Sequence, residues 1–214
     1  MEKDFIYWRH HTPIGVKVEE ISGGADRSGA VWRAMALQVW KENGRDGYRD
    51  LDHTEQGAPL LYAEHNRISL THTQGLLAVA TLPPTPECPL EVFAERTALG
   101  IDAERADRAQ TLKVRERYLG ETELALVPGD SIEANVMAWT CKEALYKAAL
   151  MPGLDWRRQI RLLRLPVPDG ETGSAEVEID GKPVPFLLYT YRSDDFLVTL
   201  AITPRTATFK KQKR

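Results

Sequence analysis

The segment at residues 139–148, WTCKEALYKA, constrains the fold of this chain most. Alanine, leucine, lysine and glutamate favour the helical state, and no glycine or proline interrupts the segment, so a helix is predicted here. On a helix, Trp139, Glu143 and Lys147 are spaced i, i+4, i+8 and lie along one side. The fold must therefore include a helix that presents a carboxylate and an ammonium group together.

A second acidic segment lies upstream, at residues 100–104, with the sequence GIDAE. It is short and apolar before its acids, which predicts the end of a strand, and Asp102 and Glu104 at i, i+2 then point to the same face. Two carboxylates from a strand and Glu143 from a helix can converge on a hard divalent cation, which takes oxygen ligands and often binds phosphates. Lys147, one turn past the helix carboxylate, could then meet a phosphate.

Each of these motifs also has an ordinary explanation. Pairs of acids are common in a chain that is 28% charged, and most of them are simply solvated. A lysine-glutamate run on a helix is typically a solvated face whose i,i+4 ion pair contributes only about 0.3–0.5 kcal/mol. The combination of the two motifs, in order and with a third segment, is what indicates phosphoryl chemistry.

The third segment comprises Gly57-Ala58-Pro59 and residues 68–75, ISLTHTQG, followed by an apolar run. With it, the chain resembles the 4′-phosphopantetheinyl transferases, specifically the larger, surfactin-synthetase type. That family carries Gly-x-Pro, a strand end with serine and histidine, Gly-Ile-Asp-x-Glu, and Trp-Ser/Thr-x-Lys-Glu-Ala-x-x-Lys. All four occur here in that order, and the resemblance covers residues 27–149.

The resemblance implies a reaction, its substrates and its cofactor. A holo-[acyl-carrier-protein] synthase of this kind moves the phosphopantetheine arm of coenzyme A to a serine of an acyl or peptidyl carrier protein and releases 3′,5′-ADP. The implied cofactor is Mg²⁺, coordinated by the carboxylates of Asp102, Glu104 and Glu143. Glu143 would also take the serine proton, and Lys147 would stabilise the phosphate or help 3′,5′-ADP to leave.

The resemblance also implies the residues that bind coenzyme A: Thr71, His72, Lys142, Lys147 and Arg27. Without the family context, a lone histidine at a strand end is more often a structural residue. An arginine near a helix start, such as Arg27, is equally consistent with a surface position. Ala58 departs from the pattern, because many relatives have a lysine there that contacts the coenzyme 3′-phosphate.

The fold implied by the resemblance is α+β, with two similar α/β halves related by a pseudo-twofold axis and the active site in the cleft between them. The proline-rich stretch at residues 83–89 marks the best boundary. It separates an N-terminal α+β half, residues 1–96, from a C-terminal half, residues 97–214, that carries the metal-binding motifs.

Local patterns predict the individual elements. A helix is expected at residues 26–41, a hairpin at 67–82, and largely helical structure at 124–150 with a break at 128–130 and a cap from Ser131. Four further strands are predicted: residues 160–166, 174–179, 184–191 and 196–202. The pair Asp180-Gly181 predicts a hairpin turn between the second and third of these strands.

Composition and charge limit the partners. The net charge is −3, with no overall basic field, so nucleic acid is not indicated. No apolar run approaches the roughly twenty residues that span a bilayer, and the N-terminus lacks a secretory apolar region, so a cytoplasmic protein without membrane contact is expected. The family type resembled is usually monomeric.

The expected carrier is acidic, and basic residues after the acidic strand offer either a docking face for it or merely a solvated helix face. These residues are Arg105, Arg108, Lys113, Arg115 and Arg117.

Two alternatives to the transferase stay open. One is a coenzyme A or nucleotide-binding module without catalysis, and the other is a magnesium-dependent phosphohydrolase that uses the same acids on water. The presence of all three carboxylates and both motif lysines favours the transferase, since a binding-only site needs no base at Glu143. The pathway is open, with fatty acid biosynthesis among the candidates.

Overall fold

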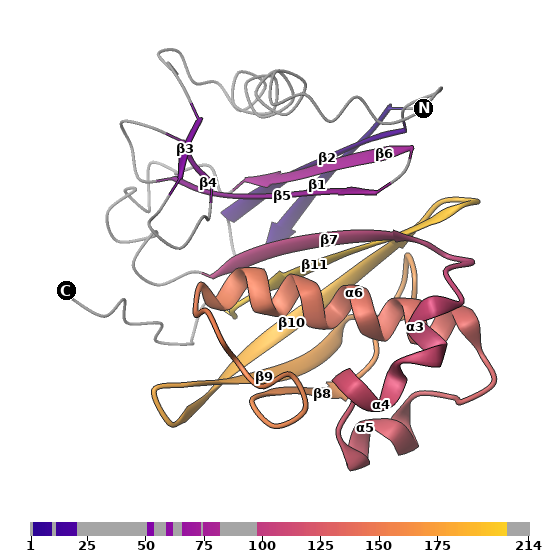
Figure 1. The fold of residues 1–214 in the computed structure, drawn as a ribbon. Helices are drawn as coiled ribbons and strands as arrows, with labels where there is room; N and C mark the ends of the chain where they lie inside the picture. The colour runs from indigo at the N-terminus through magenta and orange to yellow at the C-terminus, as the bar shows by residue number, and fades with distance from the viewer. Residues whose placement is uncertain are drawn as a thin grey trace.

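The computed structural model describes residues 2–9, 12–20, 51–53, 59–61, 66–73, 75–81 and 98–204. Before residue 98, side chains are described for residues 68–73 and 75–80. Within these ranges lie two antiparallel β-sheets and four helices (Figure 1). The predicted helix at residues 26–41, the proline-rich stretch and Arg27 lie outside the described residues.

The first sheet has the strand order β1-β2-β6-β5-β4-β3. Its strands are β1 (Glu2–Arg9), β2 (Thr12–Glu20), β3 (Leu51–His53), β4 (Pro59–Leu61), β5 (Asn66–Thr73) and β6 (Leu76–Thr81). Strands β5 and β6 form the predicted hairpin, with Thr71 opposite Ala78 and Thr73 opposite Leu76. This pairing places Thr71 and Thr73 on one face of the sheet.

The second sheet has the order β7-β11-β10-β9-β8, so β7 is an edge strand. Its strands are β7 (Leu99–Arg105), β8 (Ile160–Arg164), β9 (Gly173–Ile179), β10 (Lys182–Arg192) and β11 (Phe196–Ile202). The predicted turn between β9 and β10 is present, with φ of 53° at Asp180 and 71° at Gly181. Two positive φ angles suit the twist of a two-residue hairpin.

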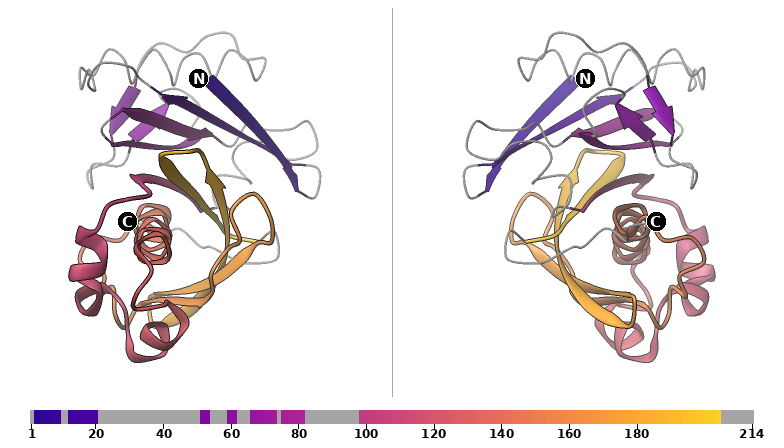
Figure 2. Two further views of the ribbon diagram at one scale, coloured as in Figure 1. Left: turned by 90° about the vertical axis from the view of Figure 1, so that its right-hand side faces the viewer. Right: turned by 90° about the vertical axis from the view of Figure 1, so that its left-hand side faces the viewer.

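The helices are α3 (Gln110–Lys113), α4 (Arg115–Tyr118), α5 (Glu121–Leu126) and α6 (Ile132–Ala149). The long helix α6 lies across one face of the second sheet, and the three short helices lie beside it (Figures 1 and 2). Ser131 caps α6 as predicted, because its hydroxyl accepts a hydrogen bond from the Ala134 N–H at 3.2 Å. The helix ends at Leu150, which has a φ of 52°.

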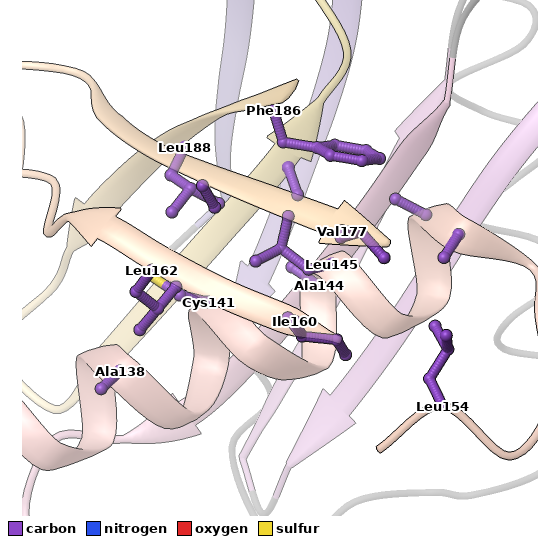
Figure 3. Packing of buried hydrophobic residues seen from close by; sticks show 14 of the residues in the cluster. Ala138, Cys141, Ala144, Leu145, Leu154, Ile160, Leu162, Val177, Phe186 and Leu188 are labelled. Atoms are coloured by element: carbon purple, nitrogen blue, oxygen red, sulfur yellow. The ribbon is translucent and has the colours of Figure 1, made fainter. Parts of the chain in front are cut away.

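The main hydrophobic core fills the space between α6 and the second sheet (Figure 3). Small residues of α6, such as Ala138 and Ala144, face large apolar residues of the strands, such as Ile160 and Phe186. Each large side chain buried in this way contributes about 1.5–3 kcal/mol. This packing fixes the position of α6, and with it the position of Glu143 and Lys147.

One polar chain crosses the core. The Thr140 hydroxyl on α6 lies 2.8 Å from that of Thr199 on β11, which lies 2.9 Å from that of Thr190 on β10. A buried hydroxyl without a hydrogen-bond partner is costly. The three linked hydroxyls therefore favour the one alignment of α6 on the sheet in which all of them are paired.

The two sheets meet where β5 lies beside the edge strand β7 (Figure 1). A second core joins them, with Leu76, Ala78 and Ala80 of β6 packed against Leu99, Ile101 and Ala103 of β7. The Ser69 hydroxyl covers the strand edge by accepting a hydrogen bond from the Ile101 N–H at 2.9 Å. The fold is thus α+β, as predicted, and both described sheets are antiparallel. The pseudo-twofold relation and the boundary at residue 96 stay predictions.

No helix among the described residues has both the length and the apolar character needed to cross a membrane.

Candidate active site

Strand β7 presents its acids toward the helix and its apolar residues toward the second core. Asp102 and Glu104 share one face of the strand, while Ile101 and Ala103 are buried on the other. Gly100 makes this approach possible, because a Cβ there would lie 2.0 Å from the Ala144 carbonyl oxygen of α6. A glycine in this motif is therefore required by packing.

Asp102 is the buried centre of the site. Its Oδ1 accepts hydrogen bonds from the Thr71 hydroxyl at 2.9 Å and from the Lys147 ammonium at 2.7 Å. Lys147 also donates to the Ile101 carbonyl at 3.1 Å. The other oxygen of Asp102, Oδ2, is buried and has no hydrogen-bond partner among the described residues. A buried carboxylate oxygen without a donor is costly, so this atom calls for a partner beyond the described side chains, such as a water molecule or an ion.

Glu104 lies near the surface of the same site. Its Oε2 is 3.4 Å from the Thr73 hydroxyl, and its Oε1 forms an ion pair with Arg108. In the part of the chain that the structure describes, no group of three or more His, Cys, Asp or Glu side chains is arranged to hold a metal ion. The predicted ligands Asp102, Glu104 and Glu143 do not form such a group in this arrangement.

Glu143 is half-buried on α6, on the same helix as Lys147. Burial raises the pKa of its carboxyl group, and the negative charge of Asp102 raises it further. Lys147 and Arg108 act in the opposite direction and lower this pKa. The charges of Asp102, Lys147 and Arg108 therefore all act on the pKa of Glu143.

The structure separates Thr71 from His72, which the sequence analysis had placed together. Thr71 and Thr73 point toward β7, where they contact the two acids. Because successive side chains of a strand point to opposite faces, His72 lies on the other face of β5, where it is exposed. Arg27, the remaining predicted coenzyme contact of the first half, lies outside the described residues.

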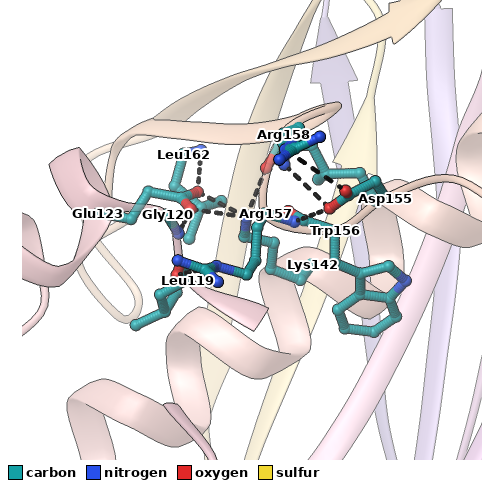
Figure 4. A network of polar contacts seen from close by, with 10 residues as sticks. Leu119, Gly120, Glu123, Lys142, Asp155, Trp156, Arg157, Arg158 and Leu162 are labelled. Atoms are coloured by element: carbon teal, nitrogen blue, oxygen red, sulfur yellow. Dashed lines mark hydrogen bonds and ion pairs between the residues drawn. The ribbon is translucent and has the colours of Figure 1, made fainter. Parts of the chain in front are cut away.

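Lys142 lies in a buried network away from these acids (Figure 4). Its ammonium group pairs with the Glu123 carboxylate at 2.7 Å and donates to the Trp156 and Ile160 carbonyls. Glu123 in turn accepts from the N–H groups of Gly120 and Leu162, both at 2.7 Å. An ammonium group has three donors, and all three are taken here. The predicted contact of Lys142 with coenzyme A is therefore corrected: Lys142 is a structural residue.

Trp139 packs against two other aromatic rings. Its ring lies 5.1 Å from that of Tyr118, edge-on, and 5.4 Å from that of Trp156. Arg115, a candidate for carrier docking, is half-buried, and its guanidinium is engaged by groups of the protein itself. Its guanidinium donates to Asn135 Oδ1 at 3.2 Å and to the Leu124 and Val127 carbonyls.

Sequence reasoning missed Thr73 and missed the site contact of Arg108. Thr73 follows Thr71 at i+2, so strand alternation alone could have placed it beside the acids. Arg108 follows Glu104 at i+4, but the strand ends between them, and no helical spacing would have paired the two.

Comparison with known families places this site in a recognised domain. Residues 98–201 match the model of the 4′-phosphopantetheinyl transferase superfamily, a range that contains Asp102, Glu104, Glu143 and Lys147. A search of curated proteins gives no match to the chain.

Proposed function

We propose, from the premise that residues 98–201 form a 4′-phosphopantetheinyl transferase domain, that this protein converts an apo carrier protein to its holo form. It would transfer phosphopantetheine from coenzyme A to a carrier serine and release 3′,5′-ADP, as a member of the surfactin-synthetase type. The observation that carries the proposal is the contact between Asp102 and Lys147 at 2.7 Å, inside the matched domain. It sets a carboxylate and a phosphate-binding cation side by side.

The carboxylates suit a Mg²⁺ ion by their chemistry. Oxygen is the ligand that this ion prefers, and the buried Oδ2 of Asp102 lacks a partner among the described residues. Asp102, Glu104 and Glu143 are the residues that would hold the ion. When bound, it would neutralise charge on the coenzyme pyrophosphate.

Glu143 is the proposed base. The serine oxygen bonds to the phosphorus that carries pantetheine, the bond from that phosphorus to the 3′,5′-ADP oxygen breaks, and the serine proton passes to Glu143. A raised pKa suits this role, because a carboxylate with a higher pKa accepts a proton more readily. Reaction therefore requires a pH at which Glu143 is ionised.

Lys147 and Thr71 would prepare the site for phosphate. Lys147 is part exposed, at 30%, so its ammonium can reach a ligand while it stays close to Asp102. Thr71 fixes the Asp102 carboxylate by donating to its Oδ1. Thr71, His72 and Arg27 remain proposed contacts of coenzyme A, and a monomer in the cytoplasm remains the proposed setting.

The test is intact-mass spectrometry of an apo acyl carrier protein incubated with this protein, coenzyme A and Mg²⁺, with an EDTA control. We expect a gain of one phosphopantetheine that EDTA abolishes. A peptidyl carrier is assayed in parallel, because the carrier class is part of the proposal. Coenzyme binding without any gain on either carrier would favour the binding module, and coenzyme breakdown without a carrier would favour the phosphohydrolase.

A further inference from the structure

Arg108 lies at the edge of the site on a rigid support. Its N–H donates to the Arg105 carbonyl at 3.1 Å, and its own carbonyl accepts from the N–H and hydroxyl of Thr111. Its guanidinium lies over the Trp139 ring, 5.8 Å from the ring centre, which favours a cation on the ring face. The backbone of Arg108 is thus hydrogen-bonded on both sides, while its side chain, 42% exposed, contacts Glu104 and the Trp139 ring.

The ion pair of Arg108 engages one of the proposed metal ligands. Arg108 binds Oε1 of Glu104, while Lys147 binds Oδ1 of Asp102. Each of the two strand carboxylates therefore already has a positive partner from the chain itself. This agrees with the finding that the described acids are not grouped to hold a metal ion.

We propose that Arg108 is a positioning residue that acts through Glu104: it is the counter-ion that Glu104 exchanges for the divalent cation. The inference rests on the proposed function, because it concerns the same acidic site. A divalent cation at Glu104 must compete with a guanidinium that already pairs with this carboxylate and lies over the Trp139 ring. Arg108 thereby sets how much free metal the site requires.

Arg105 provides a matched control. It lies on the same segment and its side chain is 40% exposed, against 42% for Arg108. It also lies over an aromatic ring, that of Phe196, at 5.7 Å. Its acid partners, however, are Asp107 and, at 4.0 Å, Asp195, and neither is one of the proposed ligands. The two arginines differ mainly in which carboxylate they neutralise.

The experiment measures binding of Mn²⁺ alone to the full chain, from the electron paramagnetic resonance signal of the free ion, without coenzyme or carrier. Arg108→Gln should bind Mn²⁺ about threefold to tenfold more tightly than the parent at low salt, because a competing charge is gone. Arg108→Lys keeps the charge and should stay near the parent, as should Arg105→Gln. Added salt should reduce the difference.

Unchanged or weaker binding by Arg108→Gln would overturn the proposal, and so would an equal gain in Arg105→Gln. Circular dichroism establishes that each variant is folded, and Arg108→Met gives the same readout should the glutamine variant not fold. A parent that modifies its carrier and binds Mn²⁺, with no change in Arg108→Gln, refutes this inference alone. A parent that neither binds Mn²⁺ nor modifies a carrier refutes the proposed function as well.

Discussion

Lys142 and Lys147 belong to one helix and one sequence motif, yet their surroundings are opposite. The side chain of Lys142 is fully buried, and its ammonium pairs with a carboxylate that is itself saturated with hydrogen bonds. Lys147 is 30% exposed, and its partner Asp102 keeps one buried oxygen without a donor among the described residues. The polar groups of Lys142 are thus paired within the protein, while the Lys147 side of α6 keeps a partly exposed ammonium beside an unpartnered carboxylate oxygen.

The charged residues of this short motif serve different purposes, and Lys142 has a structural one. Glu123 and Lys142 join α5, α6, β8 and the segment around Trp156 (Figure 4). Burial lowers the pKa of Lys142, and the charge of Glu123 acts against this. The pair therefore fixes the position of the helix that carries Glu143 and Lys147, although it does not contact either of these two side chains.

Among the substitutions considered, Lys142→Ala should have the largest effect on stability. It leaves Glu123 buried without a cation, which should lower the free energy of unfolding by about 3–5 kcal/mol. Urea denaturation followed by circular dichroism measures the change. Lys147→Ala is the matched control and should cost less, about 1.5–3 kcal/mol, because the Lys147 side chain is 30% exposed although its partner Asp102 is buried.

A double variant, Lys142→Met with Glu123→Leu, sharpens this prediction. Replacing both charges by apolar groups should recover much of the lost stability, because no unpaired charge remains buried. If Lys142→Ala unfolds at the same urea concentration as the parent, the structural role assigned to Lys142 is wrong.

Glu143→Gln tests the proposed role of Glu143 as the base. Loss of the proposed base should reduce the rate of phosphopantetheine transfer by about 10²–10⁴-fold, measured by mass spectrometry of the carrier at fixed times. In the parent, the rate should rise with pH as the Glu143 carboxyl group becomes ionised, and it should level off once ionisation is complete. Transfer at the parental rate by this variant would exclude Glu143 as the base.

Glu143→Gln should also change how the free energy of unfolding depends on pH. Because burial raises the pKa of Glu143 above its unfolded value, the folded protein holds more protons between the two pKa values. The free energy of unfolding contributed by this group therefore falls as pH rises through that window. Glu143→Gln should remove this part of the slope, which thermal unfolding across the acidic range measures; an identical slope would contradict it.

Thr71→Val gives the smallest effect. It keeps the shape of the side chain but removes one donor from Asp102, so the unfolding free energy should drop by about 1–2 kcal/mol. Thr73→Val removes only a contact of 3.4 Å and should change stability by less than about 0.5 kcal/mol. Equal thermal shifts for the two variants would show that Asp102 does not depend on Thr71.

Local patterns were enough to predict much of the fold of the described residues. The helix with its cap at Ser131, the hairpin of β5 and β6, and the turn at Asp180 and Gly181 each depend on residues close in sequence. The shared face of Asp102 and Glu104 was predictable for the same reason, since strand alternation needs no knowledge of the rest of the chain.

The roles of the lysines depended on distant residues. Lys142 and Lys147 look alike in sequence, and only the carboxylate of Glu123 and the carbonyls of Trp156 and Ile160 make the first one structural. The contact of Arg108 with Glu104 was equally hidden, because it depends on a turn after β7 and on the ring of Trp139. Such contacts follow from tertiary packing, which spacing does not encode.

The junction between the sheets has a consequence for protein engineering. The described contacts across it are made by side chains: hydroxyls at Ser69, Thr71 and Thr73, spaced i, i+2, i+4, and the apolar residues of β6 beside them. A chimera that supplies a foreign first sheet would need to reproduce this short hydroxyl ladder and its apolar neighbours to dock against β7. Because two of these hydroxyls contact Asp102 and Glu104, a foreign sheet that lacked them would also change the surroundings of both acids.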